Sequence, residues 1–176
     1  MKIFIFTISS VCIFFISCEK LGPRPVGGFS FERVAHQSDL MTDGFYYGNS
    51  YFDFSGREIY EFLVLYDNGI GRQLDFDILD NLEQVIDRAT VSENRTGWGI
   101  FRIEEDSIFY EHWLSGMGGD NVLRRSGIVL SDTTFLFTKQ QIVSARGVTD
   151  NEEVVEQLFT FRQYSPKPDS TNNFIN

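Results

Sequence analysis

Residues 44–164 alternate between short apolar stretches and polar turn sequences, a pattern typical of antiparallel β-structure. The clearest case is residues 59–66, which are rich in aromatic and β-branched side chains and end in Asp67-Asn68-Gly69. An Asn-Gly pair between two apolar stretches favours a tight hairpin turn, because both turn positions adopt positive φ. The pattern therefore predicts a hairpin whose second strand lies at about residues 70–74.

Polar turns predict two more hairpins, at Glu104-Glu105-Asp106 and at Ser131-Asp132-Thr133. Taken together, the predicted strands occupy residues 44–52, 59–66, 70–74, 97–103, 107–113, 122–130, 134–138 and 154–164. Many short strands separated by turn signals are typical of an antiparallel sandwich or barrel. We therefore expect a mainly β protein.

One segment departs from this pattern and predicts a helix. Within residues 77–89 the apolar positions follow the i, i+1, i+4, i+7, i+8 spacing of a helical face. These positions are Ile78, Leu79, Leu82, Val85 and Ile86. Asp75 or Asp77 would cap the start, where the helix dipole favours an acid. We expect this helix to pack its apolar face on the sheet or to plug one end of a barrel.

The chain begins with a different pattern, that of a secretory signal. Lys2 precedes an apolar run over residues 3–16, and the small Ser17 stands directly before Cys18. The end of this segment resembles the lipobox of bacterial lipoproteins, apart from Phe15 where that family prefers leucine. The resemblance implies cleavage before Cys18 and acylation of that cysteine, with palmitate in the anchor. An uncleaved signal anchor stays open as an alternative, although the run is shorter than the ~20 residues that span a bilayer.

These patterns divide the chain into four parts. Residues 1–17 are the predicted lipoprotein signal peptide, and residues 18–28 are the lipidated cysteine with a Gly/Pro-rich tether. Residues 29–165 form the β-domain, and residues 166–176 form a polar C-terminal tail. The length suits one domain of ordinary size.

Composition narrows the range of partners. The net charge is −10, and removal of the signal peptide takes away Lys2, which makes the chain one unit more negative. Such a chain lacks the clustered Lys/Arg surface that nucleic acids or anionic lipids require, so membrane attachment would depend on the acyl chains alone. Both cysteines, Cys12 and Cys18, are consumed by processing, which excludes disulfides and thiol catalysis from the mature domain. The eighteen phenylalanines predict a strongly aromatic core.

The β-domain resembles the lipocalin-like domains of bacterial envelope lipoproteins. The resemblance rests on Gly44-Phe45-Tyr46, on Trp98-Gly99 followed by Phe101, and on the closing stretch at 159–170. It implies an antiparallel up-and-down β-barrel of about eight strands, in which Tyr46 contacts Arg162 of the last strand and closes the barrel. The chain departs from that family in having Tyr46 in place of a tryptophan, a helix within the meander, and no cysteine that ties the tail to the barrel.

Few side chains suggest a catalytic or metal site. A zinc site needs three or four converging N or S ligands, whereas the chain has two histidines, His36 and His112, and no free thiol. The acidic clusters at Glu104-Glu105-Asp106 and at residues 150–153 lie at predicted turns, where solvated acids are expected. The glycines at 116–119 lack the helix start that a phosphate loop needs. No catalytic residue, metal ligand or cofactor is predicted.

A ligand-binding cavity inside the barrel is a better-supported functional site than a catalytic or metal site. Tyr46, Phe101, Arg102 and Tyr110 would line it, with polar tips on an apolar wall. The alternative is a barrel filled by its own side chains, as eight-stranded barrels allow. Residues 59–66 are apolar on both faces, which predicts either cover from the helix and the N-terminal segment or a docking surface.

The sequence therefore predicts a non-catalytic, lipid-anchored protein of the bacterial cell envelope, with the outer membrane as the favoured location. Its barrel would bind a small apolar ligand or a partner protein. The first alternative is a structural or inhibitory interaction module with a filled barrel. A hydrolase is ranked last.

Overall fold

The fold is known from a computed structural model, which describes residues 28–35, 39–52, 55–76, 94–114, 121–144, 147–148 and 151–175. Four features of the sequence lie outside these residues: the signal segment with Cys18, His36, the predicted helix at 77–89, and the glycines at 116–119. Within the described part, no helix is long and apolar enough to cross a membrane.

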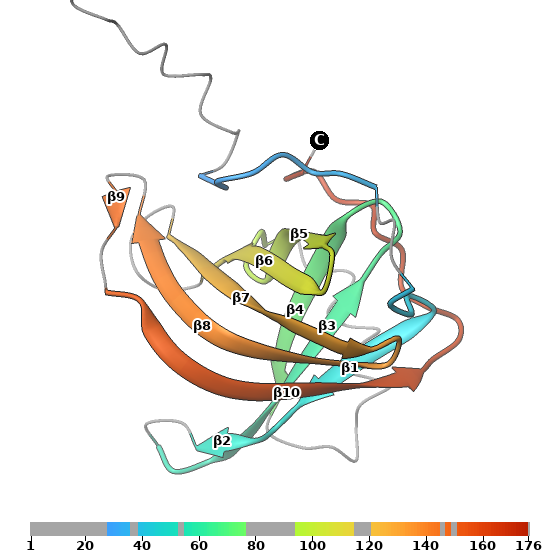
Figure 1. The fold of residues 1–176 in the computed structure, drawn as a ribbon, viewed down its shortest axis with the longest axis horizontal. Coiled ribbons are helices and arrows are strands. Elements are labelled where there is room, and N and C mark those ends of the chain that lie inside the picture. Colours follow the sequence, from blue (N-terminus) through green and yellow to red (C-terminus); the bar gives the residue numbers. More distant parts are fainter. Residues whose placement is uncertain are drawn as a thin grey trace, which may run out of the picture.

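The described residues form a closed antiparallel β-barrel (Figure 1). The strands are β1 (Gly44–Gly48), β2 (Tyr51–Phe52), β3 (Glu58–Leu65), β4 (Ile70–Phe76), β5 (Trp98–Glu104), β6 (Ser107–Trp113), β7 (Val122–Ser131), β8 (Thr134–Ser144), β9 (Gly147–Val148) and β10 (Glu153–Gln163). The barrel closes because β1 pairs with both β10 and β3. Its eight strands are β1, β3 to β8 and β10, while the short β2 and β9 pair with β3 and β8. The predicted up-and-down barrel is confirmed, and it is consistent with a lipocalin-like fold.

The three predicted hairpins are confirmed as well, although in the first turn Gly69 has the expected positive φ and Asn68 does not. In the turn between β3 and β4, Gly69 has a φ of 80° and its N–H donates to the Tyr66 carbonyl at 2.9 Å. The Asn68 side chain accepts a hydrogen bond from the N–H of Ile70 at 3.2 Å. A side chain at position 69 would be strained by the positive φ and would also meet the backbone of Val34. Glycine is therefore required both by the turn and by the N-terminal segment that crosses it.

Several strands differ in extent from their predictions, and β4 continues two residues further than expected, to Phe76. β8 continues to Ser144, well beyond the predicted end at residue 138, because the polar stretch from Lys139 to Gln141 also pairs with β7. A register shift after Ser126 accommodates this pairing. The first predicted strand, at 44–52, is divided into β1 and β2.

Aromatic side chains fill one half of the barrel interior. This half, which we call the closed end, adjoins the turns between β3 and β4, β5 and β6, and β7 and β8. Leu63 and Leu65 pack there against rings from five other strands, namely Tyr46, Phe101, Tyr110, Phe135, Phe137 and Phe159. Burial of each such side chain contributes about 1.5–3 kcal/mol. The N–H of Met41 donates to the Asp132 carbonyl at 2.8 Å, so residues 39–43 cover this end.

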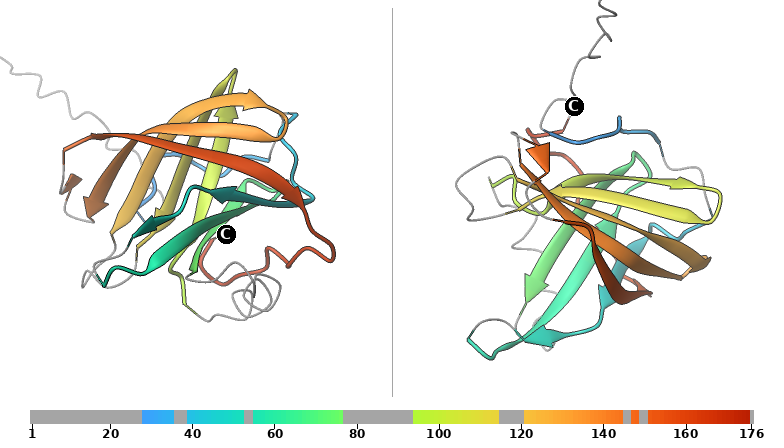
Figure 2. Two further views of the ribbon diagram at one scale, coloured as in Figure 1. Left: turned by 90° about the horizontal axis from the view of Figure 1, so that it is seen from below. Right: turned by 60° about the vertical axis from the view of Figure 1, so that its left-hand side comes forward.

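A second apolar cluster lies outside the barrel wall and explains why β3 is apolar on both faces. Phe62 and Val64 point outward and pack with Trp98 and Trp113 beneath two terminal segments. We call residues 28–35 the N-terminal segment and residues 164–175 the C-terminal segment. In Figures 1 and 2 the N-terminal segment crosses over β5 and β6, and the C-terminal segment returns to the same side of the barrel. The predicted cover from the N-terminal segment is confirmed, and the C-terminal segment adds to it.

The C-terminal segment is attached to the barrel by a half-buried cation, by further hydrogen bonds and by apolar contacts. The Lys167 ammonium donates hydrogen bonds to the carbonyls of Thr42 and Leu65. Further along, Phe174 and Ile175 pack against the outer cluster. Residues predicted from their polarity to form a tail therefore cover part of the barrel wall.

This attachment makes stability depend on pH. Burial lowers the pKa of Lys167 from 10.5 to about 8. Between these values the unfolded chain binds a proton that the folded chain does not, so the free energy of unfolding rises with pH. Relative to a Lys167→Met variant, the unmodified protein is expected to gain on the order of 1 kcal/mol between pH 8 and pH 10.5. Denaturant unfolding of both proteins across this range measures the difference, and parallel pH profiles would contradict the burial of the ammonium group.

Candidate ligand-binding site

The half of the barrel away from the three turns, which we call the open end, contains a cavity of about 530 Å³. Most of the side chains around this barrel cavity are charged or carry an amide, among them Glu61, Gln73, Asp75, Arg125, Gln140 and Gln157. An apolar minority completes the lining, with Tyr51, Leu114, Leu123 and Ile142. The size falls in the range of small-molecule sites.

Strand alternation explains how these polar groups come to lie inside. The inward positions of β3 are Glu61, Leu63 and Leu65, taken from the open end to the closed end. β4 pairs with β3 in antiparallel register, which places Gln73 opposite Leu63 and Asp75 opposite Glu61. The inner wall of the barrel therefore changes from apolar to polar along its length.

A buried ion pair forms the centre of the site. Arg125 and Glu61 have side chains that are only 6% and 3% exposed, and the guanidinium Nη1 donates to Glu61 Oε1. The same nitrogen donates to Gln73 Oε1 at 3.2 Å, and Gln73 Nε2 donates to Asp75 Oδ1 at 3.3 Å. We call these four side chains, from β3, β4 and β7, the polar network. Removing two charges from water costs several kcal/mol per ion, so burial of this pair lowers the stability of the fold unless the pairing offsets that cost.

Neutral rings at the inner edge of the closed end adjoin the polar network. Tyr110 stacks on His112 with 5.0 Å between ring centroids, and its hydroxyl donates to the Gly97 carbonyl at 3.1 Å. Burial, reinforced by the charge of Arg125, lowers the pKa of His112 well below its usual value, so the imidazole is neutral at physiological pH. Burial also raises the pKa of Tyr110.

Two carboxyl groups of the network lie side by side. Glu61 and Asp75 are cross-strand partners, and partial desolvation of Asp75 at the cavity wall, with the charge of Glu61 as a second cause, raises the pKa of the Asp75 carboxyl. Acid–base cleavage of glycosides uses two carboxyl groups that flank the scissile bond. Glu61 and Asp75 instead share one wall, and Glu61 is bound to Arg125. Their arrangement is suited to holding polar groups of a ligand.

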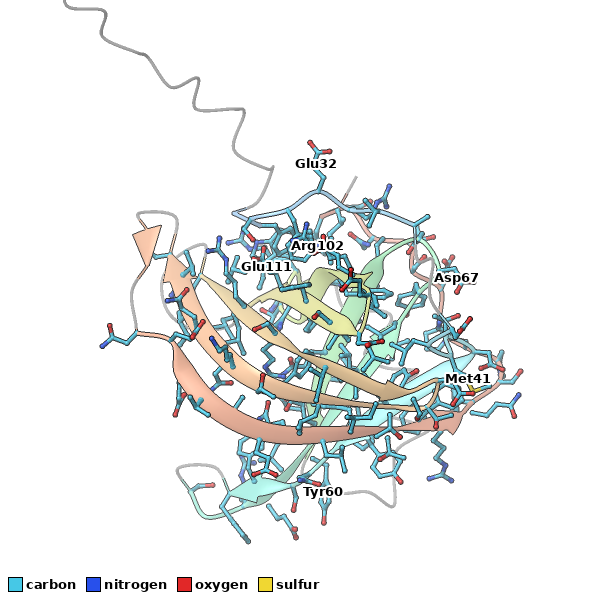
Figure 3. The ribbon with its side chains drawn as sticks, in the orientation of Figure 1. Glu32, Met41, Tyr60, Asp67, Arg102 and Glu111 are labelled. Carbon is cyan, nitrogen blue, oxygen red and sulfur yellow. The ribbon has the colours of Figure 1, made fainter. Side chains whose placement is uncertain are left out.

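The candidate lining residues predicted from the sequence do not share one place. Tyr46, Phe101 and Tyr110 lie in the buried aromatic core of the barrel interior. Arg102 lies outside the barrel, where its guanidinium is 4.6 Å from the Phe31 ring centroid and 3.3 Å from Glu104. Figure 3 shows Arg102 below the N-terminal segment. The structure therefore brings three of the four candidates together, in the filled half of the barrel.

The predicted pair Tyr46 and Arg162 lies on opposite faces of the sheet. Arg162 is exposed and is the cross-strand partner of Phe45. Tyr46 points inward and contacts Phe161 of β10, with 5.3 Å between ring centroids. First and last strands are joined here by backbone pairing and by this contact between aromatic rings.

The polar network was not predicted from the sequence. Glu61 interrupts the apolar stretch at 59–66, and this isolated charge is the signal that points to a polar interior position. Arg125 stands beside Arg124, and only the strand register shows which of the two points inward. Among the described residues, no group of three or more His, Cys, Asp or Glu side chains is arranged to hold a metal ion.

Comparison of the chain with protein-family models, with curated proteins and with solved structures finds no match. The function is therefore inferred from the residues of this chain.

Proposed function

We propose that the chain is a lipid-anchored lipoprotein of the bacterial cell envelope whose lipocalin-like barrel binds a small molecule without transforming it. The observation that carries this proposal is the cavity of about 530 Å³ at the open end, with the buried Glu61–Arg125 pair in its wall. A filled barrel would need no charged groups in its interior. Replacement of a buried ion pair by apolar side chains is often neutral or stabilising, so retention of the pair favours a role in binding.

The side chains that line the cavity favour a particular kind of ligand. A wholly apolar ligand would displace water from the donors and acceptors of these side chains that the protein itself does not pair, at a cost of about 1–3 kcal/mol for each group left unpaired. A ligand with polar groups pairs with them while its apolar parts contact Leu123 and Ile142. The proposal therefore replaces the apolar ligand expected from the sequence with a polar or amphipathic one.

A second candidate is a partner protein that docks on the outer barrel wall. Ile128 on β7 and Leu158 on β10 are the cross-strand neighbours of Leu136 on β8. Ile128 and Leu158 are 43% and 37% exposed, so they present an apolar row to solvent. Exposed apolar patches are typical of interaction surfaces.

The anchor belongs to the same proposal and is supported by the sequence of residues 1–18. Cleavage before Cys18 would leave a tether of about ten residues ahead of the N-terminal segment. The barrel would then stay close to a membrane surface, with the outer membrane as its proposed location. Binding a ligand near a membrane requires no chemical reaction in the barrel cavity.

Native mass spectrometry of the mature chain, purified from its host, tests the binding function. We expect a co-purifying small molecule in the unmodified protein and its absence in a Leu123→Trp variant, in which the larger ring occupies the cavity. Ile128→Trp is the matched control, because it adds the same ring to the exposed face of the same strand. Loss of a protein partner in the Ile128 variant, with no small molecule in any sample, would support the second candidate instead.

A further inference from the structure

We infer that the barrel cavity binds a small organic cation, an aliphatic amine of the size of a diamine or a short polyamine. The inference rests on the proposed function, since it names the ligand class of the same cavity. Three observations support it: the excess of carboxyl groups in the lining, the capacity of these groups to accept further hydrogen bonds, and the apolar side chains beside them.

The described lining carries more negative than positive groups. Glu61, Asp75 and Glu153 contribute three carboxyl groups, whereas Arg125 contributes one guanidinium group. Arg125 is in direct contact with Glu61, so the charges of these two side chains largely cancel. The carboxyl groups of Asp75 on β4 and Glu153 on β10 therefore leave an excess of negative charge at the cavity.

This excess favours a cation over a neutral ligand or an anion. A ligand that fills the cavity displaces water from Asp75 and Glu153, which is unfavourable for an ionised carboxyl group unless a positive group replaces the water. A neutral ligand supplies hydrogen bonds without charge, whereas an ammonium group supplies both. An anion would be repelled by the same carboxyl groups, and the Arg125 charge is already paired with Glu61.

The two carboxyl groups can accept hydrogen bonds from such a ligand. Gln73 donates to Oδ1 of Asp75 at 3.3 Å. On the other strand, Gln140 donates to Oε2 of Glu153 at 2.8 Å. A carboxylate has two oxygens with about four lone-pair sites, so one amide donor leaves room for another. Both residues are exposed to solvent, and an ammonium group with its three N–H donors can therefore reach them.

The rest of the lining favours an organic cation over a metal ion. Leu114, Leu123 and Ile142 present apolar surface to the same cavity, and a hydrocarbon chain would cover that surface. A volume of about 530 Å³ is in the size range of small-molecule sites. Within the described ranges, no three or more His, Cys, Asp or Glu side chains are grouped to hold a metal ion. A ligand that combines ammonium groups with a carbon chain matches both parts of the lining.

Calorimetry of the full mature chain in an uncharged detergent tests the ligand class. The probes are putrescine, cadaverine and spermidine, compared with glucose, citrate, hexanoate and Ca²⁺. We expect at least one of the three amines to bind. Its affinity is expected to fall as the concentration of NaCl is raised, because salt screens the attraction between ammonium and carboxyl groups.

Variants of single carboxyl groups test where the amine binds. Asp75→Asn and Glu153→Gln each remove one charge from the lining and are each expected to weaken amine binding about fivefold. Glu156→Gln is the matched control, because it removes the same charge from β10 at a position that does not line the cavity. It is expected to leave the affinity unchanged. Equal weakening by Glu153→Gln and Glu156→Gln would overturn the inference, since the effect would then come from the net charge of the chain.

The outcomes separate this inference from the function on which it rests. Binding of glucose, citrate, hexanoate or Ca²⁺ without any of the amines, abolished by Leu123→Trp, would overturn the amine inference and leave the binding function in place. If no probe binds, the amine inference is rejected. The binding function then stands or falls on whether native mass spectrometry finds a co-purifying molecule.

Discussion

Replacement of Arg125 by alanine is expected to lower the free energy of unfolding by about 3–5 kcal/mol, because Glu61 would be left as an unpaired charge in the barrel interior. Glu61 is only 3% exposed at its side chain, and its one ion-pair partner among the described residues is Arg125. Gln73 would lose the donor to its Oε1 at the same time. Chemical denaturation monitored by tryptophan fluorescence measures the loss.

Two variants make this prediction specific. Lys139→Ala breaks the Lys139–Glu152 pair, whose side chains are 50% and 53% exposed, and is expected to cost about 1 kcal/mol or less. The double variant Glu61→Leu with Arg125→Met removes both charges and is expected to recover most of the stability but none of the ligand binding. Equal losses for Arg125→Ala and Lys139→Ala would contradict the buried ion pair.

Replacement of Cys18 by alanine is expected to abolish lipid attachment completely. Each buried methylene of an acyl chain contributes about 0.8 kcal/mol to membrane binding, and a single chain binds only marginally, so stable attachment needs the several chains that a processed lipoprotein carries. Without the thiol no chain is added. Labelled palmitate in the purified protein, together with its partition between membrane and soluble fractions, reports the result.

Cys12→Ala is the matched control for this experiment. Cys12 lies within the apolar run of the signal segment, which is removed on processing, so its replacement is expected to leave labelling unchanged. Palmitate incorporation by Cys18→Ala, or the same membrane fraction as the unmodified protein, would rule out the lipid anchor.

The strands were predictable where local chemistry determines them. Asn68-Gly69 and the polar turns fix the hairpins, because turn conformation depends on a few neighbouring residues. The far half of β8 was missed because its Lys139-Gln140-Gln141 stretch lacks the apolar alternation of a strand at a barrel wall. That stretch is polar because it forms part of the polar half of the barrel wall. Its place there depends on the whole fold and not on neighbouring residues in the sequence.

The candidate site was less predictable for a related reason. β3 is apolar on both faces because the N-terminal and C-terminal segments cover its outer side, so hydrophobicity does not distinguish inside from outside. Aromatic residues such as Phe101 and Tyr110 were therefore expected to line a cavity, whereas they fill the closed end. The polar network comes together only through the cross-strand register of β3, β4 and β7.

The most direct test of ligand binding in the barrel is a crystal structure of the mature protein isolated from its own host. We expect a bound small molecule in the barrel cavity, within hydrogen-bond distance of Gln73, Arg125 or Gln157. A cavity filled by protein side chains, or one that holds only water in fully lipidated protein, would contradict it.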